Sequence, residues 1–429
     1  MYFLGAMGKE VLTGGSFAIS IANLSGYSIL SGLAAGMEGI SSQAFGAKKW
    51  SLMAQTLQRT ILFLLVVALF FSLGWLVFSR SFFLLWFNNP VIASIATTYL
   101  QYSIPSLLLQ AIIFPLRIFL RTQKITRPVM FSTTLSFFCQ ALITIYIVDH
   151  HQLGVRGIAL AGALTDLLTL VFILLYLHYT EVCRDTWEGW SSECFRNWLP
   201  IVRQAIPCCV SVCLEWWWYE MMTIFANGED AVACMGIIIQ TTSFIYQFPV
   251  GNELGANEPK KARRSAIVAL FCSLSLACSA ITFVMKMQMR IPKFFTDDGG
   301  ILSLAAATLP IVGLCELGNC PQTTVCGVLR GSARAKLSVY INVGSFYVVG
   351  LPVSFLLAFG MDKGLVGWCY GLLAAQLVCA VLMVRALLLT NWEEHAENAK
   401  LLMASASKAN QAESDEEAIE NLESIMLGH

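Results

Sequence analysis

Charged residues are scarce in this sequence. Asp, Glu, Lys and Arg make up 13% of its 429 residues, whereas about 25% is usual in soluble globular proteins. Basic and acidic residues number 27 each, so the formal net charge is zero. Without an excess of basic residues, we expect no nucleic-acid partner. Apolar residues reach 57% and the mean hydropathy is +0.67, which indicates an integral membrane protein.

Recognisable catalytic and metal-binding patterns are also missing. The sequence has no HExxH, nucleophile-elbow or Walker pattern, each of which marks a class of enzyme. Its 14 Cys are scattered without a CxxC pair, and its five His have no ligand spacing. We interpret the cysteines as small apolar membrane residues. We therefore predict no enzymatic activity, no metal ion and no cofactor.

Long apolar segments dominate the sequence instead. A bilayer core of ~30 Å requires ~20 apolar residues per helix. Because eleven segments meet this length approximately, we predict an all-α integral membrane fold. The segments are 12–39, 56–78, 97–120, 128–148, 155–179, 200–226, 231–249, 265–289, 301–327, 336–359 and 364–389.

Lys and Arg are concentrated in alternate connections between these segments. Basic loops mark the cytoplasmic side of a membrane protein, so we predict that these loops and the acidic C-terminal tail face the cytoplasm. Arg121 and Arg330, which end two segments, are interpreted as anchors at that face. The basic connections are 40–55, 117–127, 250–264 and 330–336, whereas the basic loop 286–300 dissents.

An internal repeat relates the two halves of the chain. QAFGAKK is similar to NELGANEPKK, FLRTQKITRPVMFSTTLSFF to VLRGSARAKLSVYINVGSFY, and LGVRGIALAGALTDLL to KGLVGWCYGLLAAQLV; matching residues lie 209 or 210 positions apart. Parallel repeats of this kind occur in transporters. The counterpart of segment 200–226 would start before Met1, so the first half is expected to lack its opening helix. We predict a first lobe of five helices at 1–180, a second of six at 196–390 with segment 231–249 shortened, and a cytoplasmic tail at 391–429.

Five motifs carry a resemblance to a known family. They are GMEGISSQAFGAKKW, CLEWWWYE, VGNELGANEPKKAR, GVLRGSARAKLSVYINVGSFYVVGLPV and GLLAAQLVC. From about Gly14 to Trp392, the chain resembles the multidrug and toxic compound extrusion (MATE) family, in its plant detoxification branch. This resemblance implies a two-lobe bundle, here with about eleven of the usual twelve transmembrane helices. It also implies a monomeric multi-pass protein of the plasma membrane or of a vacuolar or endosomal membrane.

The activity implied by the resemblance is proton-coupled export of small organic solutes by alternating access. Xenobiotics, secondary metabolites and hormones are the solute classes expected, with the lipid bilayer and protons as the other partners. Two alternatives stay open at this point. One is a truncated, non-transporting or regulatory product of a transporter gene, and the other is a flippase for lipid-linked substrates.

Three acidic residues lie near the middle of apolar segments: Asp166, Glu215 and Glu316. A charge at the bilayer centre costs at least ~2.5 kcal/mol, so such residues usually face a cavity or a partner. An acid that keeps its proton avoids this cost, as a proton coupler requires. Glu215 matches the proposed proton site of plant relatives. Their second acid aligns with Asn319, three residues after Glu316.

We predict Glu215 and Glu316 as the proton-coupling residues. Glu316 shares a helix face with Asn319 and Thr323, which is typical of a cavity wall. Aromatic faces suit organic cations, and amide groups can orient a solute. The predicted substrate cavity is lined by Asp166, Gln240, Tyr246, Asn319, Gln322, Tyr340 and Asn342.

Overall fold

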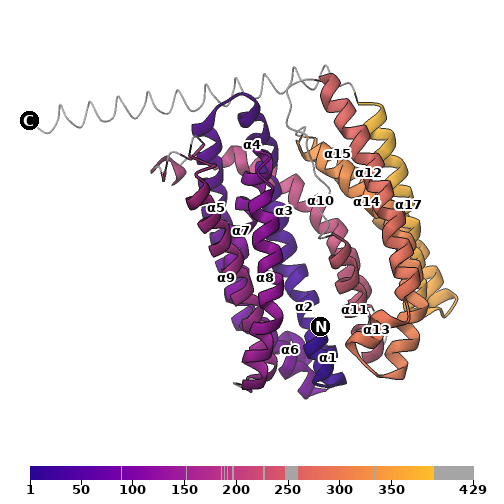
Figure 1. The fold of residues 1–429 in the computed structure, drawn as a ribbon. Helices are drawn as coiled ribbons and strands as arrows, with labels where there is room; N and C mark the ends of the chain where they lie inside the picture. Colours follow the sequence, from indigo (N-terminus) through magenta and orange to yellow (C-terminus); the bar gives the residue numbers. More distant parts are fainter. Residues whose placement is uncertain are drawn as a thin grey trace, which may run out of the picture.

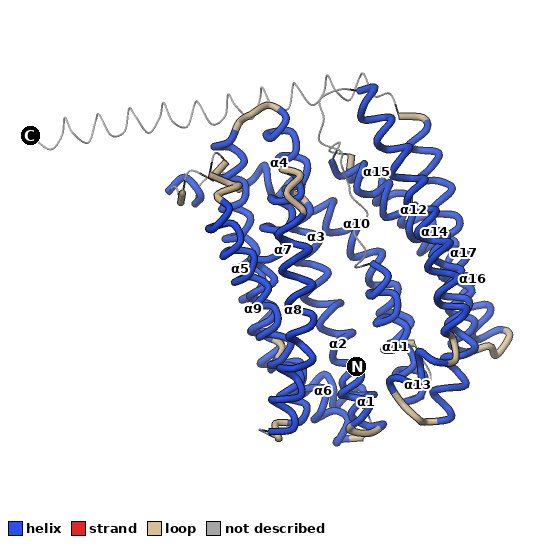
Figure 2. The backbone as a smooth tube through the Cα atoms, viewed as in Figure 1, coloured by secondary structure: helices blue, strands red, loops and turns tan. Residues whose placement is uncertain are grey.

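The computed structural model describes residues 1–390 apart from 88, 151, 185, 188, 191, 196–197, 226–227, 247–258 and 332–333. The regular structure throughout this part of the chain is helical (Figure 2). The all-α prediction is therefore confirmed. The predicted tail, 391–429, lies outside the described residues.

Two groups of helices lie side by side in Figure 1. The first-half bundle comprises α1 (Tyr2–Ala6), α2 (Lys9–Ala22), α3 (Ser28–Ala35), α4 (Met37–Gly46), α5 (Trp50–Trp86), α6 (Pro90–Tyr102), α7 (Ile104–Thr122), α8 (Arg127–Ile145) and α9 (Gly154–Thr180). The second-half bundle comprises α10 (Leu199–Ile224), α11 (Glu229–Tyr246), α12 (Pro259–Met287), α13 (Arg290–Phe295), α14 (Gly299–Gly331), α15 (Ala335–Asn342), α16 (Leu351–Phe355) and α17 (Gly364–Leu388). Short π-helical turns at Asn23–Tyr27 and Val343–Gly350 continue α2 into α3 and α15 into α16.

Ten helices in the described part of the chain are long and apolar enough to cross a membrane. They correspond to ten of the eleven predicted segments; the eleventh, 231–249, forms the 18-residue α11 and is not among them. Hydropathy predicts segment 97–120 as one helix, but the structure contains a break between α6 and α7 at Ser103. Pro105, which has no N–H group to donate, lies at the start of α7 and accounts for the interruption.

Buried apolar side chains form two large clusters. One is built mainly by the first-half bundle around Phe17, Trp75 and Phe119, and the other mainly by the second-half bundle around Trp218 and Trp368. Helix α10 contributes to both, because its Ala205 belongs to the first cluster and its Trp218 to the second. Helices α10 and α11 accordingly lie between the two groups (Figure 1).

The contact between α3 and α10 depends on two glycines one helical turn apart. A Cβ added to Gly32 would lie 2.6 Å from Cα of Cys209, and one added to Gly36 would lie 2.4 Å from Cα of Ala205. Small residues at this spacing allow membrane helices to approach closely. Helix α10, although it opens the second half of the chain, is therefore held against the first.

We expect Gly36→Ala to destabilise the protein. The added methyl group meets the backbone of α10, which cannot move aside as a side chain can, and overpacking of this kind costs about 1–3 kcal/mol. Thermal unfolding in detergent should show a lower melting temperature. Gly162→Ala on α9 is the matched control, since nothing lies within 4 Å of its added Cβ. Equal melting temperatures for the two variants would show that the α3–α10 contact does not need a glycine.

Candidate functional site

Helix α10 places Glu215 near α14 of the second-half bundle. The helix begins with Pro200 near its first turn and contains Pro207, eight residues before Glu215. Glu215 is half-buried, and its charge interacts with those of Glu316 and Arg330 on α14. Its carboxyl group therefore lies on the side of α10 toward α14.

Glu316 lies at the centre of a hydrogen-bonded chain that joins α14 to α17. Its side chain is 1% exposed. Its Oε2 accepts a hydrogen bond from Asn319 Nδ2 at 3.0 Å and one from Cys320 Sγ at 3.5 Å. Asn319 Oδ1 in turn accepts from Gln376 Nε2 of α17 at 3.4 Å. The acid predicted from its position in an apolar segment is therefore buried among amide groups.

A second chain of hydrogen bonds joins α14 to α15 and α10. Gln322 Nε2 donates to Asn342 Oδ1 at 3.5 Å, and Asn342 Nδ2 donates to the backbone oxygen of Ser211 at 3.1 Å. The hydroxyl groups of Ser211 and Ser338 lie 2.9 Å apart. Ser211 precedes Glu215 by one turn of α10, so this second chain reaches the face of α10 that carries Glu215.

Two buried amide oxygens of these chains have no hydrogen-bond partner in the described part of the structure. They belong to Gln322 and Gln376, and both side chains are 0% exposed. A buried polar atom without a partner costs about 1–3 kcal/mol and calls for an explanation. Water or a bound solute that donates hydrogen bonds to these two amide oxygens in another state of the protein would explain them.

The structure brings together three of the predicted cavity residues with both predicted acids. Asn319, Gln322 and Asn342 belong to the hydrogen-bonded chains around Glu316 and Glu215. Tyr340 does not join these hydrogen-bonded chains. It lies two residues from Ser338 and from Asn342, on the opposite face of α15, and is 73% exposed. The side chains of Gln240 and Tyr246 lie outside the described part of the chain.

Asp166 lies apart from this group, within the first-half bundle. Its carboxylate on α9 accepts hydrogen bonds from Ser106 and, at 2.9 Å, from Gln110 Nε2, both on α7. By the repeat offsets of 209 and 210, Gln110 corresponds to Asn319 and Asp166 to Gln376. The two bundles thus carry a hydrogen-bonded pair at equivalent positions, with the carboxylate only in the first.

Two contacts between the bundles were not predicted from the sequence. Glu220, 3% exposed on α10, accepts a hydrogen bond at 3.0 Å from Nδ2 of Asn23 in the first-half bundle. Glu38 of α4 contacts Arg121 at 2.9 Å and Arg330 at 3.5 Å. The interpretation of the two arginines as membrane anchors is therefore wrong, because both guanidinium groups converge on a buried carboxylate. Because Arg121 and Arg330 occupy equivalent positions of the two repeats, the sequence could have suggested that they share a partner.

No group of three or more His, Cys, Asp or Glu that could hold a metal ion occurs among the described residues. The side chains around Glu215 and Glu316 instead offer protonation and hydrogen bonding.

Comparisons with known proteins identify the family of this chain. The model of the MatE family matches residues 1–147 and 207–356. Protein DETOXIFICATION 48 of Arabidopsis thaliana is 46% identical over 417 residues, which cover 94% of this chain and 78% of that protein. Multidrug and toxin extrusion protein 1 of Xenopus tropicalis is 29% identical and is matched over 93% of this chain and 71% of its own length. The crystal structure of the eukaryotic MATE transporter AtDTX14 superposes with a TM-score of 0.84, at 26% identity, covering 92% of this chain and 91% of that one. The predicted resemblance and membrane fold are confirmed, and the chain belongs to the MatE family as a multidrug and toxin extrusion transporter of the plant detoxification type.

Proposed function

We propose that this transporter exports small organic solutes in exchange for protons, and that Glu215 and Glu316 carry the coupling protons. The observation that supports this most is that two acids, Glu215 on α10 and Glu316 on α14, lie near enough for their charges to interact. Two neighbouring carboxylates cannot both ionise without mutual repulsion. Proton binding to the pair is therefore sensitive to any change in the distance between α10 and α14.

Alternating access requires that protonation change the relative position of the bundles. Helix α10 is suited to transmit such a change, because it carries Glu215 toward α14 and also packs against α3 through Ala205 and Cys209. An organic cation near Glu215 would favour the ionised form of this acid. Protonation of Glu215 would remove the negative charge and so favour release of the cation. Each ligand thus stabilises a different state, which is what coupling by differential binding requires.

The bundles contact one another by ion pairs at both ends of the molecule. Glu38 and Arg330 meet at the end where α4 lies (Figure 1), which we propose faces the cytoplasm. At the other end, Lys9 of α2 lies 2.5 Å from Asp230 of α11. Contacts of this kind can break at one end while they hold at the other, which supports a rocking motion of the bundles.

We expect Glu316→Gln to slow proton-driven transport about tenfold, equivalent to about 1.4 kcal/mol. The amide keeps the shape of the side chain but removes the negative charge of the carboxylate that accepts the hydrogen bond from Asn319. A hydrogen bond to a charged group contributes about 1.5–3 kcal/mol. Uptake of an organic cation into proteoliposomes under an imposed pH gradient measures the effect.

Glu181→Gln is the control for this substitution, since Glu181 pairs with Arg184 at 2.9 Å with its side chain 65% exposed. The control should retain full transport. Wild-type rates in Glu316→Gln would remove Glu316 from the proposal. If the wild-type protein itself transports none of the cations, hormones and organic anions offered, a binding or regulatory role replaces the proposed export.

A further inference from the structure

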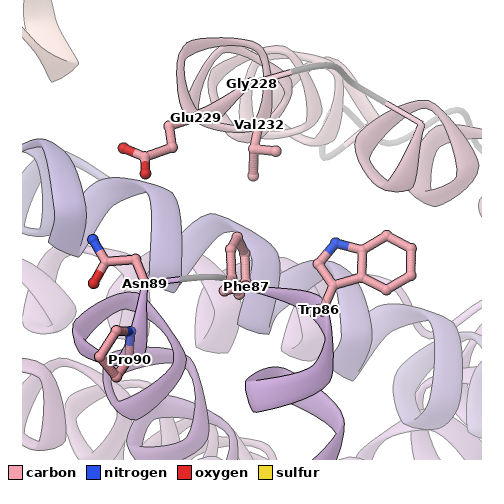
Figure 3. Close-up of a pocket in the computed structure, with 7 residues that line it drawn as sticks. All are labelled: Trp86, Phe87, Asn89, Pro90, Gly228, Glu229 and Val232. Atoms are coloured by element: carbon pink, nitrogen blue, oxygen red, sulfur yellow. The ribbon is translucent and has the colours of Figure 1, made fainter.

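A cavity of about 870 Å³ lies within the first half of the chain, near the end where α4 lies. It is lined by α5 with Leu57, by α7 with Leu116 and by α9 with Leu174, and α7 packs against both of the other helices. Figure 1 shows these three helices on the side of the first-half bundle that faces away from the second-half bundle. The cavity in Figure 3, where the ends of α5 and α6 face α11, lies between the bundles instead.

The connection that follows α9 closes one end of this cavity and is fixed to the bundle by hydrogen bonds. Thr186 Oγ1 donates to Gln123 Oε1 at 2.9 Å, and both side chains are buried. Gln58 Nε2 of α5 donates to the backbone oxygen of Gly189. The closed end is therefore a built part of the structure.

The other side of the cavity is open where α9 meets its surroundings. Leu174, which lines the cavity, is 51% exposed, and α9 is long and apolar enough to cross a membrane, so its exposed surface at this depth is in contact with lipid. An apolar hollow holds water poorly, and an empty one loses the dispersion contacts of its lining. A component of the membrane is therefore the occupant that fits this cavity.

Two tryptophans place the closed end of the cavity at the membrane surface. Trp187 and Trp190 line it, with ring centroids 5.8 Å apart in an edge-to-face arrangement. Tryptophan is enriched at the level of the lipid headgroups. The occupant is thus expected to place its polar group at this end and its apolar body along α7 and α9.

The charges at the closed end do not suit an anionic headgroup. Arg184 is already paired with Glu181 at 2.9 Å, and the same connection also contains Asp185 and Glu188 in its sequence. Anionic lipids bind clusters of basic residues, which this connection lacks. His178 also lines the cavity, and its imidazole forms no hydrogen bond with any residue in the described part of the chain. An imidazole can donate to or accept from a hydroxyl group.

We propose that this cavity binds a membrane sterol. The sterol hydroxyl group hydrogen-bonds to His178 at the membrane surface, and the fused rings lie against Leu116 and Leu174. A rigid ring system loses less conformational entropy on binding than the acyl chains of a phospholipid do, and its uncharged polar group matches an end whose charges are paired. The proposal goes beyond the export function and does not depend on it.

Photolabelling of the full chain in phosphatidylcholine nanodiscs tests the proposal, with a diazirine-bearing cholesterol as the probe. Peptide mass spectrometry should locate the label on α7, α9 and the connection after α9, and unlabelled cholesterol should displace it. Leu174→Trp fills the mouth of the cavity and should lower this labelling about tenfold. Leu175→Trp is the matched control, because the adjacent Leu175 is 45% exposed but does not line the cavity; its labelling should stay within about twofold of wild type.

The hydroxyl contact has a separate test. His178→Phe should weaken displacement by unlabelled cholesterol about threefold to tenfold, as expected for one lost hydrogen bond. The epimer of cholesterol with an inverted hydroxyl group should compete more weakly than cholesterol in wild type, and the two should compete equally in His178→Phe. Melting temperatures in detergent confirm that each variant is folded.

Three results would overturn the proposal. One is equal labelling of folded Leu174→Trp and Leu175→Trp, and another is equal competition by the two epimers in wild type. The third is a photoactivatable phosphatidylcholine that labels the same peptides and is not displaced by cholesterol, which would assign the cavity to a phospholipid. None of these measurements requires transport, so the sterol site and the proposed export function stand or fall independently.

Discussion

Replacement of Glu215 by Gln should abolish transport driven by a pH gradient, with at least a hundredfold loss of initial rate. The amide occupies the same volume but cannot release a proton, so the interaction of residue 215 with Glu316 and Arg330 no longer changes with pH. A hundredfold loss corresponds to about 2.7 kcal/mol, which is modest for removal of a partly buried charge. Initial uptake into proteoliposomes at several imposed pH differences measures it.

Glu220→Gln is the control on the same helix. Glu220 is also a buried acid of α10, and its Oε1 accepts from Asn23; the amide oxygen of Gln can accept that bond. This variant should retain pH-driven uptake within a few-fold of wild type. Both proteins should melt at similar temperatures in detergent, which separates loss of coupling from loss of fold. Full pH-driven uptake in folded Glu215→Gln would contradict the assignment.

Replacement of Glu38 by Gln should open the α4 end of the molecule. Glu38 is the common partner of Arg121 and Arg330, which lie at equivalent positions of the two repeats. Its side chain is 8% exposed and that of Arg330 is 15% exposed. Breaking a buried pair by removal of one partner costs about 3–5 kcal/mol. The unpaired Arg330 would favour separation from α4, so the bundles would part more often at this end.

Native Cys208 reports this opening. It lies on α10 and is 4% exposed, and its thiol is close enough to interact with the charges of Glu38 and Arg330. Maleimide labelling of Cys208, followed by peptide mass spectrometry, should be about tenfold faster or more in Glu38→Gln than in wild type. Adding Arg330→Gln to Glu38→Gln should reverse much of the increase, because no unpaired guanidinium group remains. Equal labelling rates in wild type and Glu38→Gln would show that the ion pairs do not hold the bundles together.

Hydropathy was sufficient to locate most membrane-spanning helices, because the thickness of a bilayer dictates their length. The direction in which the side chains of short helices point was harder to predict from the sequence. The sequence groups Tyr340 with Asn342, but Ser338 and Asn342 contact Ser211 of α10, which leaves the exposed Tyr340 on the opposite face of α15. The break at Ser103 cannot be predicted from hydropathy, which is similar on both sides of it; Pro105 is the sequence signal that marks it.

Partners distant in sequence were the hardest to predict. Glu38 lies 83 residues from Arg121, and no local pattern connects them. The repeat, in contrast, contains information about such contacts. The offset that relates Arg121 to Arg330 also relates Gln110 to Asn319 and, one residue longer, Asp166 to Gln376. Gln110 is hydrogen-bonded to Asp166, and Asn319 to Gln376, so either contact could have been predicted from the other.

Proton release on substrate binding tests the central claim most directly. Purified protein in weakly buffered detergent solution, with a pH-indicator dye, is mixed with a saturating transported solute in the absence of any membrane or gradient. We expect that wild-type protein releases protons as the solute binds and that Glu215→Gln, while still binding the solute, releases none. A wild-type protein that binds its solute without proton release, or a Glu215→Gln variant that releases as many protons as wild type, would contradict the coupling role of Glu215.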